Sequence, residues 1–389
     1  MTPWFKEMKG KHKIYMKKKL LLIFGFLLII CLAVSGCTSV GLATSWPGLT
    51  HAAELSYVAY GNYVYAVNNS DGTLAWRFPQ ELKQQTVFYA APAKADNLLV
   101  FGDYADVLYG VDAATGQSLW EFKEAKDKYV GSPLLENNLI YAPNADGHLY
   151  VLDTNGKLIW RFKTGKANWS KPVSDGTNLY LGSMDHFIYA LKLRYSQNEI
   201  SADETGKRLA VQKPLWKTDL ETAIFAEPLL SNEQTLYAGT LGGELFALDT
   251  SNGKILWSYS TEGKLKGIWS SPVLIGDVLV FGDSQGKLYA LDAKTGAEKW
   301  KNPVEAGNAI IGGGAILVDD KVAFVTTAGK LLVLDVDGNE LWSKTFTEQI
   351  YTQPKVDGDY IYLAAVGQDF LLTKIDPNGR EFWSFNPTK

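Results

Sequence analysis

Cys37 is the residue whose type and setting most clearly indicate chemistry. It ends the run Val34-Ser35-Gly36-Cys37, which matches a lipobox, where small residues let a peptidase reach the bond before a Cys whose thiol carries diacylglycerol. Ahead of it, Met16 starts a basic segment, and the apolar run from Leu20 to Val34 is too short for a membrane-spanning helix of about 20 residues. We therefore expect residues 1–36 to be a lipoprotein signal peptide with Met16 as its true start, and Cys37 to be lipidated.

This signal predicts an exported protein that is anchored to a membrane by the lipid on Cys37. Residues 37–46 are rich in Ser, Gly, Thr and Ala, which is typical of a short flexible tether. The expected location is the outer face of the cytoplasmic membrane or the outer membrane. Cys31 is the only other cysteine, so the part beyond the signal can form no internal disulfide and must be stabilised by packing.

The other residues that could do chemistry do not form a recognisable site. His51, His148 and His186 show no metal-ligand spacing, so we expect them to be hydrogen-bonded turn or strand residues. No Gly-x-Ser-x-Gly, Gly-x-x-x-x-Gly-Lys or His-Glu-x-x-His motif occurs. The run Gly312-Gly313-Gly314 is better explained by close backbone approach than by phosphate binding. The sequence therefore predicts no catalytic, cofactor-binding or metal-binding residues.

Most of the chain is a repeat that would position any site. An aromatic-Ala-Leu-Asp segment, a Gly and a Trp recur eight times, and the Trp residues are 44, 40, 56, 41, 43, 42 and 41 residues apart. These tryptophans, which we expect to pack between neighbouring sheets, are Trp76, Trp120, Trp160, Trp216, Trp257, Trp300, Trp342 and Trp383. A period in the low forties with four short strands per repeat is typical of a β-propeller. We expect an all-β fold over residues 47–389, with eight blades of four antiparallel strands.

One repeat, Ser270–Trp300, shows the expected strands most clearly. An inner strand follows Pro272, and the second and third strands are expected at 278–282 and 287–292. Gly296 supplies a turn, and the fourth strand is expected to end at Trp300. The proline recurs in six repeats and is replaced by Ala52-Ala53 in the first and by Gly312-Gly313-Gly314 in the seventh. In six repeats an Asp before the last turn is expected to accept backbone N–H bonds: Asp112, Asp153, Asp249, Asp292, Asp335 and Asp376.

The repeat tail, Tyr-Ala-Leu-Asp-x-x-Thr-Gly-x-x-x-Trp at 289–300, resembles that of the quinoprotein-like propellers, named after pyrroloquinoline quinone (PQQ). With the lipobox, the single propeller and the chain length, it also resembles the BamB family of lipoproteins of the outer-membrane β-barrel assembly machinery. That resemblance implies a non-enzymatic, protein-binding scaffold without a cofactor. The alternative is a PQQ-dependent dehydrogenase-like protein, whose family site needs Ca²⁺ ligands, an Asp base and adjacent cysteines, none of which can be matched here.

Two structural questions stay open at this point. The repeat ending at Trp216 is about fourteen residues longer, and the excess, Arg194–Gln212, is either a solvated hairpin or a docking loop at one rim. The ring closes either by packing of blade 1 on blade 8 or by a swapped strand. Beyond residue 36 the chain has 31 basic and 41 acidic residues, which argues against nucleic acid as a partner. We expect a monomeric propeller that binds an envelope protein at a rim.

Overall fold

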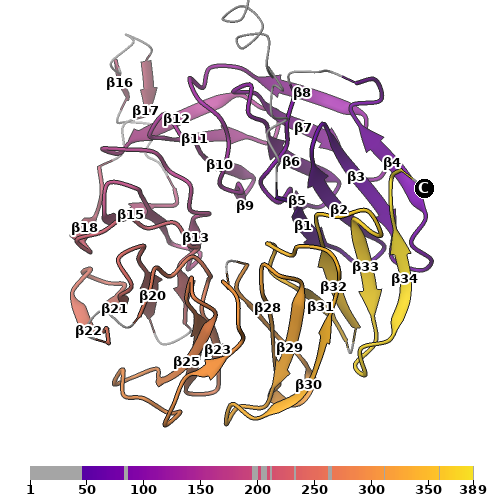
Figure 1. Cartoon of the computed structure of the whole chain (residues 1–389). Coiled ribbons are helices and arrows are strands. Elements are labelled where there is room, and N and C mark those ends of the chain that lie inside the picture. Colours follow the sequence, from indigo (N-terminus) through magenta and orange to yellow (C-terminus); the bar gives the residue numbers. More distant parts are fainter. Residues whose placement is uncertain are drawn as a thin grey trace, which may run out of the picture. The chain divides into compact units, whose positions relative to one another are not determined.

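Eight small β-sheets form a ring. The computed structural model describes residues 46–388, except 83–85, 195–199, 203–207, 211–212, 232–233, 262–264, 311 and 359. Each sheet has four strands in sequence order, paired antiparallel from the channel outward, and one sheet carries two more strands (Figure 1). Apart from one turn of 3₁₀ helix, Val318–Asp320, the regular elements described are all strands. The predicted all-β, eight-bladed propeller is confirmed.

The strands of each blade follow one another along the chain. Blades 1 to 4 consist of β1 (Gly48–His51), β2 (Leu55–Tyr60), β3 (Tyr63–Asn68), β4 (Leu74–Phe78); β5 (Ala93–Ala95), β6 (Leu98–Gly102), β7 (Leu108–Asp112), β8 (Ser118–Phe122); β9 (Leu134–Glu136), β10 (Leu139–Pro143), β11 (His148–Asp153), β12 (Leu158–Lys163); β13 (Val173–Ser174), β14 (Asn178–Gly182), β15 (Phe187–Lys192) and β18 (Trp216–Asp219). Blades 5 to 8 consist of β19 (Leu229–Leu230), β20 (Thr235–Gly239), β21 (Leu245–Asp249), β22 (Ile255–Tyr259); β23 (Val273–Ile275), β24 (Val278–Gly282), β25 (Lys287–Asp292), β26 (Val304–Glu305); β27 (Gly314–Ile316), β28 (Val322–Val325), β29 (Lys330–Leu334), β30 (Glu340–Thr345); β31 (Lys355–Asp357), β32 (Tyr360–Ala364), β33 (Leu372–Ile375) and β34 (Glu381–Phe385).

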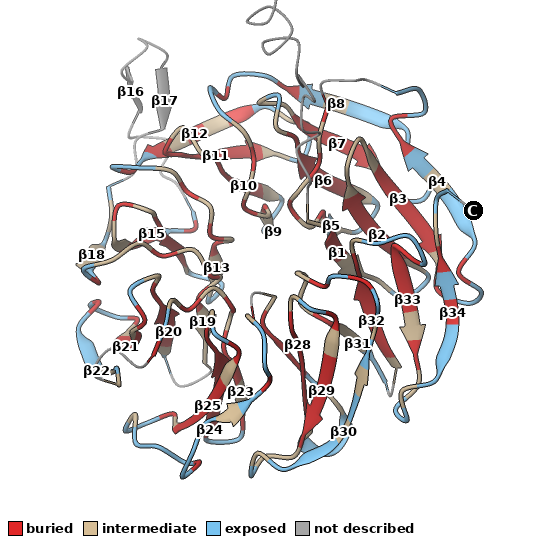
Figure 2. Ribbon diagram, viewed as in Figure 1, coloured by how far each residue is buried: buried red, intermediate tan, exposed pale blue. Residues whose placement is uncertain are grey.

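The second and third strands of each blade are buried on both faces, whereas the outermost strands are largely exposed (Figure 2). In β24 all five residues are buried. Val280 of blade 6, for example, belongs to the same hydrophobic cluster as Phe324 and Leu332 of blade 7. Because each sheet packs between two neighbours, its middle strands read as near-continuous apolar runs.

A β-bulge recurs in the outermost strand of six blades. The register shifts at the residue just before the repeat Trp, as in the pairing of Ala66 with Trp76 and of Val67 with Leu74. The bulged residues are strongly exposed in several blades, for example Leu119, Leu256 and Phe382, which are 52–58% exposed. A bulge increases the local twist, and here it accompanies a Trp side chain that faces the next blade.

The repeat tryptophans connect neighbouring blades. Six of them donate an Nε1–H bond of 2.9–3.1 Å to a carbonyl in the last turn of the following blade: Trp76, Trp120, Trp216, Trp257, Trp300 and Trp383. The ring of each also lies against the glycine of that turn, as Trp257 does against Gly296. The turn aspartates accept backbone N–H bonds as expected; Asp292, for instance, accepts from Lys294 and Thr295.

The ring closes by packing of blade 8 on blade 1, without a swapped strand. Blade 1 takes all four strands from residues 48–78 and blade 8 from residues 355–385. Trp383 donates to the carbonyl of Asn69 at 3.0 Å and lies over Gly72. Thr352 Oγ1 donates to the carbonyl of Pro47 nearby. The seam between the chain ends therefore repeats the contact made between other blades.

Two expectations for individual strands were wrong. Trp300 lies outside any strand, and the fourth strand of blade 6 is the short β26, which pairs with Lys287 and Leu288. Pro303 has no N–H for the ladder, and the strand resumes only beyond it. In blade 1, the register places Leu49, not Ala52-Ala53, at the position of the inner-strand proline. In blade 7 the glycines do occupy that position, and a Cβ on Gly312 would lie 2.5 Å from the backbone of Thr352.

The insert of blade 4 pairs with its neighbour. Within it, β16 (Ile200–Ala202) and β17 (Arg208–Ala210) form a hairpin, and β17 pairs in parallel with β12 at Trp160, which makes blade 3 six-stranded. The expected rim excursion is therefore corrected: the described part of the insert extends the outer edge of blade 3. Trp160 is fully buried, and its Nε1 has no hydrogen-bond partner in the described chain. In six other blades the acceptor lies in the last turn of the following blade, and in blade 4 the insert takes the place of that turn.

Candidate functional site

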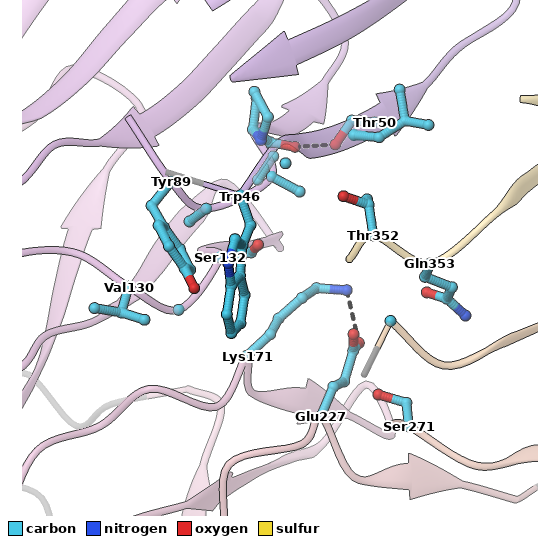
Figure 3. Close-up of a pocket in the computed structure, with 18 of the residues that line it drawn as sticks. Trp46, Thr50, Tyr89, Val130, Ser132, Lys171, Glu227, Ser271, Thr352 and Gln353 are labelled. Carbon is cyan, nitrogen blue, oxygen red and sulfur yellow. Dashed lines mark hydrogen bonds and ion pairs between the residues drawn. The ribbon is translucent and has the colours of Figure 1, made fainter. Parts of the chain in front are cut away.

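Seven residues, all but Val130 aromatic, line one mouth of the central channel. Each precedes the inner-strand proline, or its equivalent, by three residues, so the repeat places them at the same level in successive blades. This position holds Trp46, Tyr89, Val130, Trp169, Phe225, Trp269 and Tyr351 in blades 1 to 6 and 8. Trp46, the last residue of the expected tether, thus belongs to the wall of the channel. Figure 3 shows Trp46 and Tyr89 beside the polar residues of the channel.

The aromatic rings form two arcs. In the first, Trp46 stacks on Tyr351 with ring centroids 4.9 Å apart, and it lies 5.4 Å from Tyr89, which stacks on Tyr104. In the second, the rings of Trp169, Phe225 and Trp269 follow at 6.2 and 5.1 Å. Offset and tilted contacts of this kind stabilise aromatic pairs. Both arcs present apolar surface that is only partly buried in the channel.

A belt of polar side chains lies deeper in the channel. Lys171 and Glu227 form an ion pair of 2.7 Å, which Figure 3 shows near Ser271 and Gln353. Lys355 donates to the side-chain oxygen of Gln353 at 3.0 Å. Burial lowers the pKa of Lys355 from its usual value, with Glu227 opposing the shift and Lys171 adding to it.

The polar belt separates two cavities. The aromatic cavity has a volume of about 500 Å³, and a second cavity of about 530 Å³ shares Lys171, Glu227 and Lys355 with it. The rest of its lining consists mostly of aliphatic residues on and beside the inner strands, such as Leu229 and Ile316, with Ser231, Ser271 and Gln353 among them. Volumes of this size are typical of small-ligand sites. The channel therefore offers an aromatic mouth, a charged middle and an aliphatic mouth.

The three histidines do not come together. His148 is buried and bonded to Asp146 at 3.1 Å, and His186 lies in a turn with φ of 79°. Only His51 lines the aromatic cavity. No cluster of three or more His, Cys, Asp or Glu side chains that could hold a metal ion occurs within the ranges described.

His51 lies between a serine and an aspartate, an order found in nucleophilic triads. Its Nδ1 is 3.0 Å from Ser56 Oγ, and its Nε2 is 3.5 Å from Asp357 Oδ2. Ser56, however, is fully buried and donates to Asn69 Oδ1 at 2.7 Å. A nucleophile must reach its substrate, so this arrangement fits a structural role at the seam between blades 1 and 8.

The residues that line the channel do not provide the ligands that a Ca²⁺–PQQ centre needs. Both cysteines lie in residues 1–45, outside the described part and outside the propeller. The channel lining in the described chain offers one carboxylate, Glu227, and that carboxylate is already bound to Lys171, whereas Ca²⁺ takes six to eight oxygen ligands. The polar belt is therefore not built to hold this metal and its quinone.

Sequence reasoning missed the aromatic mouth and the polar belt. The signal was present, because the residues three positions before each inner-strand proline are mostly aromatic, and those one position before include Lys171, Glu227 and Gln353. Cys37 and the expected signal lie outside the described residues, so lipidation stays a prediction. In the part of the chain that is described, no helix has the length and apolarity needed to cross a membrane.

Comparisons with known proteins find sequence relatives that include assembly factors and enzymes. Outer membrane protein assembly factor BamB of Legionella pneumophila is 28% identical over 130 residues, 33% of this chain and 32% of that protein. Tetrathionate hydrolase of Acidithiobacillus ferrooxidans is 24% identical over 276 residues, 57% of this chain and 54% of that protein. The quinoprotein alcohol dehydrogenase PedE of Pseudomonas putida is 30% identical over 76 residues, which are 19% of this chain and 12% of that protein. The alignments thus span from about an eighth to about half of these relatives.

The crystal structure of BamB from Moraxella catarrhalis superposes with a TM-score of 0.65 at 18% identity, covering 82% of this chain and 90% of that one. At this identity the likeness shows the fold alone. The family model described as outer membrane protein assembly factor BamB matches residues 60–211, 200–312 and 306–389. Because these matches run through nearly the whole propeller, the chain belongs to the family of outer membrane protein assembly factor BamB.

Proposed function

We propose that this chain is an exported, lipid-anchored scaffold that binds another envelope protein during the assembly of outer-membrane proteins. The observation that carries the proposal is the family match over residues 60–389. Anchoring through Cys37 rests on the lipobox. A shared membrane raises the effective concentration of a nearby partner, so a modest interface suffices.

The partner site that we propose is the edge of blade 3 with its added hairpin. β17 pairs with β12, which leaves β16 as the last strand of a six-stranded sheet. The terminal strand of a sheet has backbone N–H and C=O groups on one side that can pair with another chain. The insert is also the clearest departure of this chain from its own repeat.

In-cell photocrosslinking tests this site. A photoreactive residue at Ser201 in β16 should give a discrete adduct with an envelope protein. The control is Lys294, because it lies in the turn of blade 6 that the insert replaces in blade 4. Equal and diffuse labelling from both positions would show that the insert is a solvated hairpin and that the partner binds elsewhere.

A PQQ-dependent dehydrogenase is the second candidate, favoured by the quinoprotein dehydrogenase relatives. The channel residues count against it, because the single carboxylate of the lining is bound to Lys171. Dye-linked oxidation of alcohols or sugars by the purified chain with added PQQ and Ca²⁺ would establish this candidate.

A further inference from the structure

The aromatic cavity is positively charged, although the protein is acidic. Its lining contains Lys94, Lys171 and Lys355 but one carboxylate, Glu227, while the whole chain has a formal charge of −4. Lys171 is neutralised by Glu227 at 2.7 Å. Lys94 is exposed and donates to the carbonyl of Asp96. Of the two partly buried lysines, Lys355 is the one for which the described chain shows no ion pair.

Lys355 is half-buried and forms no ion pair within the described chain. Within the described chain its Nζ donates to a neutral group, the Gln353 amide oxygen, and forms no ion pair. Its pKa is lowered by burial, which means that the surroundings solvate the ammonium poorly. A half-buried cation of this kind is stabilised by an anion that hydrogen-bonds to it.

Aromatic side chains form much of the remaining wall. The two aromatic arcs supply flat apolar surface in a cavity of about 500 Å³. Trp169 contributes its ring, while its Nε1, which has no hydrogen-bond partner among the described residues, is covered by protein atoms.

We propose that this cavity binds a carboxylate attached to an aromatic group, either a free small molecule or the carboxyl-terminal residue of a peptide. Lys355 binds the carboxylate, and the aromatic arcs cover the ring. A cationic ligand would be repelled by Lys355, and a neutral one would leave it without a counterion. The proposal does not depend on the scaffold role, because the cavity lies in the channel and not at the edge of blade 3.

The matched probes are N-acetyl-phenylalanine and its uncharged amide, N-acetyl-phenylalaninamide. Calorimetric titration of the full-length chain in detergent should show at least roughly tenfold tighter binding of the acid, as expected for one charge-assisted hydrogen bond. Equal affinities for the two probes would overturn the proposal. So would the absence of binding by the acid up to about 10 mM, where a millimolar Kd is measurable.

Variants assign the binding to the cavity. K355M should weaken binding of the acid roughly tenfold, K355R should retain most of the affinity, and W169F should weaken binding of the acid to a lesser extent. K123M is the matched control, since Lys123 lies on the outer surface with a 65% exposed side chain. Unchanged affinity of a folded K355M for the acid would overturn the proposal. If K355M fails to fold, K355R and W169F provide the test. Unchanged affinity of W169F for the acid, together with loss of binding in K355R, would then contradict the proposal.

The two sources of the carboxylate are separated by a third probe, a pentapeptide that ends in phenylalanine with a free carboxyl group. Tighter binding of the peptide than of N-acetyl-phenylalanine indicates a protein terminus as the ligand. Equal or weaker binding indicates a small molecule. Both outcomes support the proposed carboxylate chemistry, provided that the amidated peptide binds at least roughly tenfold more weakly.

Discussion

Gly72, in the last turn of blade 1, supports the contact that closes the ring. A Cβ added to it would lie 2.7 Å from Cε3 of Trp383, and its φ is +76°. Gly61 is the matched control, because its φ is +57° but nothing lies within 4 Å of an added Cβ. A left-handed conformation costs a non-glycine residue about 1–2 kcal/mol, and overpacking costs about 1–3 kcal/mol more. We therefore expect Gly61→Ala to lower the free energy of unfolding by about 1–2 kcal/mol, and Gly72→Ala to lower it by about 2–5 kcal/mol.

Urea unfolding of single and double variants measures the contact directly. Trp383→Ala alone should cost about 3–5 kcal/mol, since it removes a large buried ring, and Trp383 is 8% exposed. In the Trp383→Ala background, Gly72→Ala should cost no more than Gly61→Ala, because the ring that an added methyl would meet is gone. The two substitutions should thus be non-additive. Equal losses for Gly72→Ala and Gly61→Ala in the otherwise unchanged protein would refute this account of ring closure.

Three other residues lead to predictions of their own. Burial lowers the pKa of His51 below 6.5, although Asp357 opposes the shift. Below pH 6.5 the imidazole is therefore more often protonated in the unfolded state than in the folded state. Stability should therefore fall as the pH drops from 6.5 through the folded-state pKa, and His51→Gln should flatten this part of a urea-midpoint profile; an identical profile would exclude His51 as the cause. Trp300→Ala should cost about 3–5 kcal/mol in the same unfolding assay, and a loss under about 1 kcal/mol would contradict the burial of this ring between blades 6 and 7. Cys37→Ser should abolish incorporation of labelled fatty acid in cells, and continued labelling would disprove the lipobox.

Local sequence patterns were sufficient to predict the strands that local turns define. The strands at 278–282 and 287–292 were predicted to the residue, because Gly276-Asp277 and the turn at 283–286 fix both ends. The fourth strand of that blade was not, because the ladder can resume beyond Pro303 only with a register that depends on its partner β25. A proline is visible in the sequence, but the place where pairing restarts is set by the neighbouring strand.

Contacts between blades were harder to predict than contacts within them. The pairing of β17 with β12 joins an insert of blade 4 to blade 3, and no local pattern selects that partner. The aromatic mouth escaped notice for another reason: Tyr89, Trp169 and their equivalents lie in the connections before the inner strands, where no strand periodicity marks them. Their constant distance from the proline was the usable signal.

The scaffold role is tested most directly by the state of the outer membrane when the protein is missing. The measurement is the amount of folded β-barrel protein in the outer membrane of the source organism, compared between cells that contain the full-length chain and cells depleted of it. Our account predicts that depletion lowers the folded fraction and that the full-length chain restores it. Unchanged amounts of folded β-barrel proteins after complete depletion would contradict a role in outer-membrane protein assembly.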